Sequence, residues 1–264
     1  MEIFKTIFQH SHILWNMIMR DIRTRYSGSA LGIFWSIINP IIMLLVFTFV
    51  FSIIFNTRIE GYGEKRGFLE FFLCGFIPWL AFQEGAIRST SIIVENTNLV
   101  KRVRFPSELL ILSTVISIFL LQLIGFSIFI GVLIAFGKIR GELAFLFLPL
   151  VFFLQIIFTV GLGFILSSIH VFFRDVAQIS QSLFWVWFYC TPVIYPTSMV
   201  PEQFRKILMI NPMTHLLEIY RALILQGRVQ EWSGIFYFCF LSLILFVAGE
   251  KIFFKLKHVF DDYL

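Results

Sequence analysis

Four polar or aromatic side chains recur along one side of an apolar segment near residue 180. They follow the spacing i, i+4, i+7 and i+11, which places one helix face on Gln178, Ser182, Trp185 and Tyr189. Trp187 points elsewhere. Flat rings stack on sugar faces, while amides and hydroxyls hydrogen-bond to sugar hydroxyls. The stripe therefore predicts a hydrated passage for a sugar chain.

Ser36 and Asn39, in the first apolar run, are assigned to the same passage. A second interpretation of the stripe stays open, because polar side chains in membrane spans also form hydrogen bonds between packed helices. In that case the stripe would be a helix–helix contact.

The most basic loop of the chain is Glu95–Pro106, with the sequence ENTNLVKRVRFP. Its cations Lys101, Arg102 and Arg104 interrupt two membrane-length apolar runs, and such cations favour the cytoplasmic side. They either set topology only or also form a docking site for a soluble partner. We favour the second interpretation.

The sequence shows neither a recognisable energy source nor a catalytic centre. The nearest approach to a phosphate loop, residues 131–139, has five residues between its glycines and no Ser or Thr after the lysine. No predicted span has an ionisable group at its centre, which argues against a proton- or sodium-driven carrier. The five histidines are dispersed, so neither a catalytic nor a metal site is predicted.

Composition places the chain in the membrane. Of its 264 residues, 58% are hydrophobic and only 14% are charged. The net charge of +5 is scattered at the ends of apolar runs, which argues against nucleic-acid binding. The three cysteines lie in apolar stretches without CxxC spacing and are interpreted as packing residues.

We expect a single all-α membrane domain over residues 1–264 with six transmembrane helices. The predicted spans are about 33–55, 67–87, 109–136, 144–169, 176–195 and 233–254. Residues 1–30 are expected to form an amphipathic helix in the membrane interface, and 88–108 a cytoplasmic loop. Glu70 and Glu84, in the second span, are interpreted as interfacial carboxylates that reach water.

Residues 196–232 are too polar to span and too apolar for a free loop. They predict short amphipathic helices, broken at Asn211-Pro212, that dip into the outer face. Gly161 and Gly163 predict close helix contact in the fourth span. The proposed inner segments carry more Lys and Arg than the outer ones, so both termini are expected in the cytoplasm.

Three motifs, in order, resemble the permease subunits of ABC-2-type exporters of bacterial surface polysaccharides, such as O-antigen, capsule and teichoic acid. The first is RYSGSALGIFWSIINP at Arg25–Pro40. The second is GFIPWLAF at Gly75–Phe82 followed by SIIVENTNLVKRVRFP at Ser91–Pro106. The third is FFRDV at Phe172–Val176, followed by TPVIYP and NPM. The match covers nearly the whole chain.

The resemblance implies a homodimeric permease in the bacterial inner membrane that moves a lipid-linked polysaccharide outward. ATP and Mg²⁺ would be bound by a separate cytoplasmic ATPase, with no cofactor in this chain. The residues that the resemblance assigns to ATPase coupling are Arg20, Asp21, Arg23, Arg25, Tyr26, Glu95, Asn98, Lys101, Arg102 and Arg104. Those it assigns to an outer gate are Tyr195, Pro196, Pro201, Asn211 and Pro212. The alternatives are a permease for another amphiphile, such as a lipid or drug, and a membrane-embedded glycan-modifying enzyme.

Overall fold

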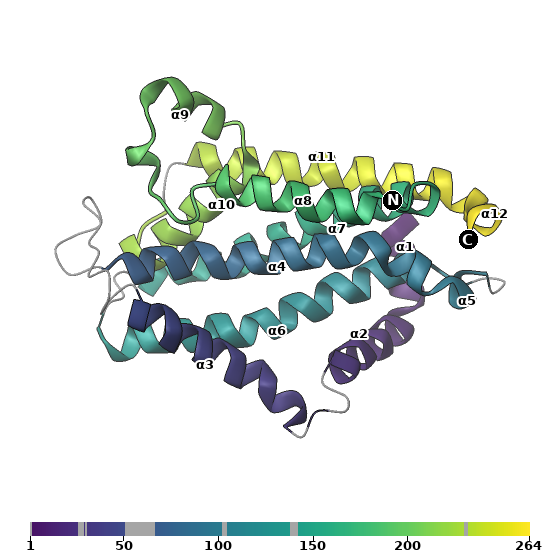
Figure 1. Cartoon of the computed structure of the whole chain (residues 1–264), viewed down its shortest axis with the longest axis horizontal. Helices are drawn as coiled ribbons and strands as arrows, with labels where there is room; N and C mark the ends of the chain where they lie inside the picture. Colours follow the sequence, from purple (N-terminus) through teal and green to yellow (C-terminus); the bar gives the residue numbers. More distant parts are fainter. Residues whose placement is uncertain are drawn as a thin grey trace.

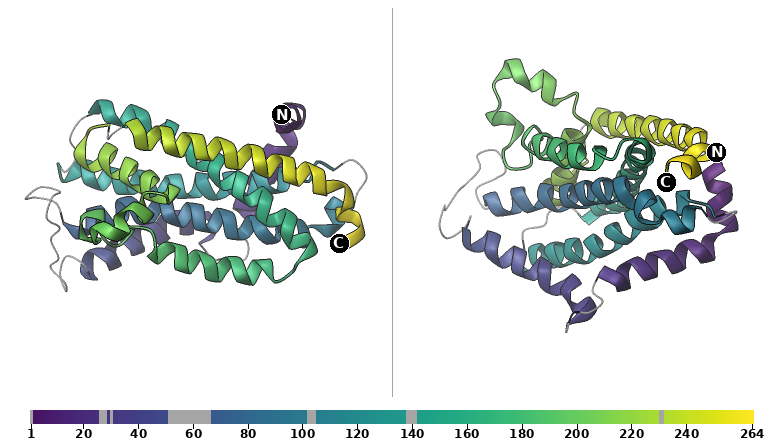
Figure 2. Two further views of the ribbon diagram at one scale, coloured as in Figure 1. Left: turned by 90° about the horizontal axis from the view of Figure 1, so that it is seen from above. Right: turned by 45° about the vertical axis from the view of Figure 1, so that its right-hand side comes forward.

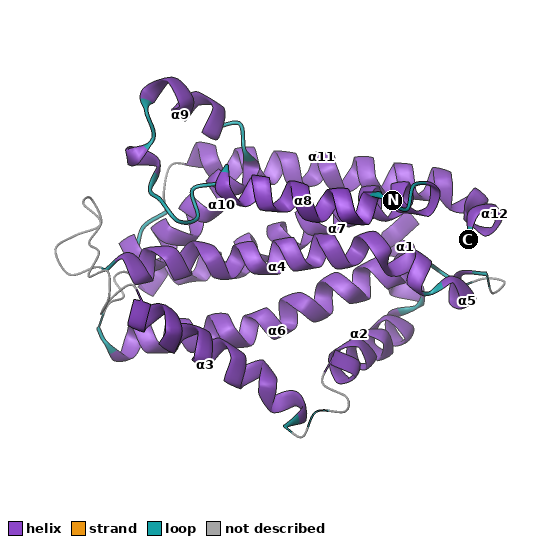
Figure 3. Ribbon diagram, viewed as in Figure 1, coloured by secondary structure: helices purple, strands orange, loops and turns teal. Residues whose placement is uncertain are grey.

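The computed structural model describes residues 2–25, 29, 31–50, 67–101, 105–137, 142–229 and 232–264. Within these ranges the chain forms helices joined by turns and no β-strand (Figure 3). This agrees with the predicted all-α class.

Six helices form an elongated bundle (Figures 1 and 2). They are α3 (Trp35–Thr48), α4 (Phe68–Glu95), α6 (Glu108–Ala135), α7 (Leu148–Phe172), α8 (Val176–Tyr189) and α11 (Trp232–Leu256). Short 3₁₀ turns precede α3 at Gly32–Phe34 and α7 at Glu142–Phe147. By length and hydropathy, three helical segments qualify as membrane spans among the described residues: Glu108–Ala135, Ala144–Phe172 and Trp232–Tyr263.

Two helices end at other residues than the predicted spans. Helix α8 ends at Tyr189 and not at 195, because Pro192 disfavours helical backbone at Thr191. Helix α4 continues to Glu95, eight residues past the predicted end, so the following loop is correspondingly shorter. The far end of the first predicted span lies in residues 51–66, outside the described part of the chain.

The amino-terminal region forms two helices, α1 (Glu2–Gln9) and α2 (Ser11–Arg25), in place of the single helix predicted. Helix α2 packs on α6 and buries Leu14, Met17, Ile18 and Ile22. Helix α1 reaches α11, where the backbone N–H of Ile3 donates to Glu250 Oε1 at 3.1 Å.

A close helix crossing joins α7 to α11. A Cβ on Gly161 would lie 2.7 Å from the backbone of Phe246, and a Cβ on Gly249 would lie 2.3 Å from the carbonyl oxygen of Gly161. A Cβ on Gly163 would likewise lie 2.9 Å from the Cβ of Ser89 on α4. The prediction that Gly161 and Gly163 permit close helix contact is confirmed.

The segment after α8 contains a 3₁₀ turn at Thr197–Met199, then α9 (Glu202–Leu208) and α10 (Pro212–Arg221). The two helices are broken at Asn211-Pro212, as predicted, but they differ in burial. Helix α10 packs against α4 and α11, and its buried residues include Leu216, Leu217 and Tyr220. Helix α9 projects from the bundle (Figure 1). A π-helical turn, η5 (Ala222–Gln226), follows α10 and ends at Gly227, which has φ 65°.

The two chain ends lie at the same end of the bundle, opposite α9 and α10 (Figure 1). The short helix α5 (Thr97–Val100) lies there too. So does the carboxy-terminal α12 (Phe260–Tyr263), where Phe260 is fully buried. Lys257, in the preceding turn, pairs with Glu108 at 2.6 Å.

Candidate functional site

The polar and aromatic stripe of α8 faces away from the bundle. Gln178 and Ser182 are exposed, and the side chains of Trp185 and Tyr189 are 55% and 63% exposed. The opposite face of α8 is buried through Ser180, Phe184 and Phe188. The same exposed side also carries the apolar residues Ile179, Leu183 and Val186. The stripe is therefore a mixed surface that no other part of the described chain covers.

Trp187 belongs to the interior, as the helical spacing predicts. Its ring stacks on Phe184 with centroids 5.6 Å apart, and it meets Phe82 edge-on at 5.2 Å. Its indole Nε1–H donates to Asn211 Oδ1 at 3.0 Å. Trp187 thus fixes α8 to the start of α10.

Asn39 lines a cavity of about 250 Å³ between α3, α4 and α6. The polar or aromatic residues of its wall include Arg25, Trp35, Glu84 and Gln122. The side chain of Ser36, assigned to the same passage, lies outside the described part of the structure. Because α4 stands between α3 and α8, one chain does not bring Asn39 together with the stripe (Figure 1).

A charged network joins α2 to the bundle beside this cavity. Arg25 Nη2 lies 2.6 Å from Glu84 Oε1, and Arg88 Nη2 lies 3.2 Å from Asp21 Oδ1. Ser117 Oγ, on α6, donates to Asp21 Oδ2. Two predicted coupling residues, Asp21 and Arg25, are therefore engaged with α4 and α6.

The two glutamates of α4 have different surroundings. The side chain of Glu84 is 45% exposed and pairs with Arg25, and its place at the membrane interface stays a prediction. Glu70 is only 5% exposed, so the expectation that its carboxylate reaches water is wrong. Its position in the first turn of α4 suits a carboxylate, because the helix N-terminus carries partial positive charge.

The remaining predicted coupling residues in the described chain are exposed at the end of the bundle that carries both termini. They are Arg20 and Arg23 on α2, Glu95 at the end of α4, Asn98 on α5, and Lys101. Tyr26, Arg102 and Arg104 lie outside the described residues.

The predicted gate residues occupy the opposite end. Asn211 caps α10 by accepting from Met213 N–H, and its Nδ2 donates to Thr191 Oγ1 at 2.8 Å. Pro212 is the first residue of α10. Pro196 is buried, whereas Pro201 is exposed before α9.

Tyr195 lies beyond the end of α8, and its hydroxyl donates to the Tyr189 carbonyl at 2.9 Å. This hydrogen bond ties the segment after α8 back to the last turn of that helix.

Sequence reasoning missed a polar group inside the bundle. Tyr220 Oη donates to Gln155 Oε1, and Gln155 Nε2 donates to the carbonyl of Pro78, both at 2.8 Å. Arg221, the next residue, is fully buried. The one signal in the sequence was the position of Gln155 within an apolar run, because an amide in such surroundings needs a hydrogen-bond partner. Within the described residues, no cluster of His, Cys, Asp or Glu could hold a metal ion.

The chain is similar along most of its length to named transport proteins. It is 31% identical over 250 residues to the O-antigen export system permease protein RfbA of Klebsiella pneumoniae, an alignment that covers 93% of this chain and 92% of the relative. It is 28% identical to the protein of the same name from Myxococcus xanthus, covering 99% and 98% of the two chains. The polysialic acid transport protein KpsM of Escherichia coli is 25% identical, with 88% and 89% covered. The model of the ABC-2 type transporter family matches residues 12–225, and the chain belongs to that family.

Proposed function

We propose that this chain is the membrane permease subunit of an ATP-driven exporter that moves a lipid-linked polysaccharide outward across the bacterial plasma membrane. The observation that carries the proposal is end-to-end similarity to permeases named for O-antigen export. The similarity to a polysialic acid transport protein supports the same class of substrate. The chain is then a transport subunit and not an enzyme, and a separate ABC ATPase binds ATP and Mg²⁺.

In this proposal α3, α4, α6, α7, α8 and α11 are six spans, and both termini are cytoplasmic. The exposed cations Arg20, Arg23 and Lys101 at one end of the bundle support this orientation. The 14 residues of α8 are only about 21 Å long, so the segment 190–196 would complete that crossing. Helices α9 and α10 would then lie at the outer face as the gate.

The passage is proposed to lie between two copies of the chain related by a twofold axis. The exposed stripe on α8 supports this, because it offers stacking and hydrogen-bonding groups that its own chain leaves uncovered. In a dimer, α8 of one copy can approach α3 of the other, which would unite Asn39 and Ser36 with the stripe. The single chain keeps these two groups apart.

The ATPase is proposed to bind the surface formed by Arg20, Arg23, Glu95, Asn98 and Lys101. Tyr26, Arg102 and Arg104 are assigned to the same surface from the sequence. Asp21 and Arg25 would have a different task, since their ion pairs hold α2 against α4. Movement of α2 would therefore be transmitted to α4 through these ion pairs. Movement of α5 would be transmitted through the backbone, because α5 follows α4 in the chain.

Charge reversal on this surface is expected to weaken binding between the permease and the ATPase. The double substitution Arg23→Glu and Lys101→Glu should reduce the ATPase that copurifies with the chain at least several-fold, because both positive charges face solvent where the partner binds. Arg228→Glu, the same change at the opposite end of the bundle, is the control. Equal ATPase recovery with all three chains would contradict the docking surface.

The proposed function is tested by reconstituting the chain with its ATPase in liposomes that contain a lipid-linked O-antigen. ATP should make the glycan accessible to an added glycosidase on the far side, and native mass spectrometry of the complex should count two copies of the chain. Transport of lipids or drugs without the glycan would favour the other-amphiphile alternative. Modification of the glycan by the chain alone would favour the enzyme alternative.

A further inference from the structure

A fully buried arginine ends α10. The guanidinium of Arg221 contacts three parts of the chain: Nη1 lies 3.1 Å from Glu218 Oε1, Nη2 donates to the Val193 carbonyl at 3.0 Å, and Nε donates to the Phe71 carbonyl at 3.4 Å. Its Cζ also lies 3.6 Å from the centroid of the Phe71 ring. Arg221 thus connects α10, α4 and the loop after α8.

This set of contacts suits an arginine in particular. A buried cation needs a counter-charge and acceptors for its other donors, which Glu218 and the two carbonyls provide. The planar guanidinium directs donors in several fixed directions while its face rests on an aromatic ring. A lysine would retain the charge but could not reach two carbonyls from separate segments in the same geometry.

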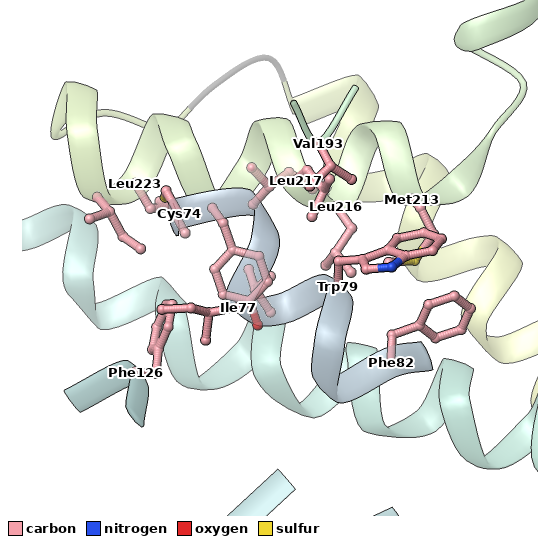
Figure 4. Packing of buried hydrophobic residues seen from close by; sticks show 14 of the residues in the cluster. Cys74, Ile77, Trp79, Phe82, Phe126, Val193, Met213, Leu216, Leu217 and Leu223 are labelled. Carbon is pink, nitrogen blue, oxygen red and sulfur yellow. The ribbon is translucent and has the colours of Figure 1, made fainter. Parts of the chain in front are cut away.

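The backbone of α4 has a place for this side chain. A Cβ on Gly75 would lie 2.7 Å from Arg221 Nη2, so any larger residue would displace the guanidinium. Gly75 is one helical turn after Phe71, and both therefore lie under Arg221. Figure 4 shows how Val193 and Leu217 approach this part of α4 near Cys74.

Other contacts also attach α10 to the helices of the bundle. Tyr220 reaches the Pro78 carbonyl of α4 through Gln155 of α7, and Asn211 joins the start of α10 to Trp187 of α8. Helix α9, by contrast, exposes Phe204 and Ile207. The outer segment therefore has one fixed half, α10, and one half with few contacts, α9.

Helix α4 is a single helix that contains Pro78 and extends past Phe71 to Glu95, beside the proposed ATPase surface. We propose that Arg221 is the positioning residue that makes α10 and the loop at Val193 follow α4, so that movement at the cytoplasmic end reaches the outer gate. This inference rests on the proposed function. It adds Arg221 to the residues assigned to the gate from the sequence, and it gives the gate a mechanical connection to the rest of the permease.

The test measures movement of α9 in the complete complex with the ATPase. A cysteine at Ile207, with Cys190 and Cys239 replaced by Ser, is labelled by a membrane-impermeant maleimide with and without ATP. In the otherwise native chain, ATP should change the labelling rate at least fivefold. Arg221→Met should reduce that change to less than twofold while the complex still hydrolyses ATP. Arg221→Lys should restore thermal stability through Glu218 but not the labelling response.

A second pair of variants keeps the inference testable if Arg221→Met does not assemble. Gly75→Ala should displace the guanidinium and lose the response, whereas Gly131→Ala, with nothing within 4 Å of the added methyl, should keep it. Where all variants assemble, the effects of Gly75→Ala and Arg221→Met on the labelling response should be non-additive, because both substitutions disrupt the same contact.

Several results would overturn the inference. They are an unchanged response in Gly75→Ala, a response lost equally in Gly131→Ala, or the absence of any response to ATP in the native chain. The assay needs no glycan. A complex that responds to ATP but moves no polysaccharide would therefore refute the proposed function and leave the role of Arg221 intact.

Discussion

Alanine at position 249 is expected to destabilise the whole permease, because the new methyl group has no space. Its Cβ would lie 2.3 Å from the carbonyl oxygen of Gly161, and this neighbour is backbone that cannot rotate away. Helices α7 and α11 would have to separate along their crossing. Overpacking of this kind typically costs roughly 1–3 kcal/mol, and Gly249→Leu should prevent folding altogether.

The measurement is thermal unfolding of the purified chain in detergent, together with its yield. Gly131→Ala is the matched control: it makes the same change on α6 with nothing within 4 Å. If the Gly249→Ala and Gly131→Ala variants unfold at the same temperature, the close crossing of α7 and α11 is not the contact that limits stability.

Alanine substitutions of the two tryptophans of α8 are expected to affect different properties, stability for Trp187 and export for Trp185. Trp187→Ala removes a ring packed on Phe184 and Phe82 and leaves Asn211 Oδ1 without its indole donor. Removing a large aromatic ring from a core costs about 3–5 kcal/mol. Trp187 is partly buried against the core cluster, so this variant should mainly lose stability. Trp185 is 55% exposed, so Trp185→Ala should leave the stability of the single chain nearly unchanged.

Export should show the reverse pattern. Trp185→Ala and Tyr189→Ala should each lower glycan export several-fold at normal complex yield, because the passage would lose rings on which sugars stack. Export per folded complex in Trp187→Ala should stay near that of the native chain. An export loss in Trp185→Ala that simply follows loss of the dimer would instead support the helix-packing interpretation of the stripe.

Local patterns in the sequence were enough to predict the long apolar helices and the break at Asn211-Pro212. Helix α6 begins at Glu108 and ends at Ala135, within one residue of the predicted span. This succeeded because composition and proline chemistry are properties of neighbouring residues. The stripe on α8 was predictable for the same reason, since a single helix determines which of its residues share a face.

Contacts between distant segments could not be predicted in this way. Arg221 looked like one more cation in an amphipathic segment, because its acceptor at Phe71 is 150 residues away. Asp21 and Arg25 matched a motif for partner binding, yet Arg88, which pairs with Asp21, is 67 residues away, and Glu84 draws Arg25 toward the bundle. The burial of a charge depends on which segments meet, and the order of residues along one helix does not contain that information.

The hydrogen bond from Ile3 to Glu250 affects the order in which the chain can be completed. Ile3 is synthesised before its acceptor Glu250, which lies on α11. At roughly 5–20 residues per second, the 247 residues from Phe4 to Glu250 take about 12–50 s to make. During that interval the Ile3 N–H lacks the Glu250 carboxylate. A nascent chain that stalls before α11 therefore leaves this N–H without its native acceptor and the Ile3 side chain without part of its native surroundings.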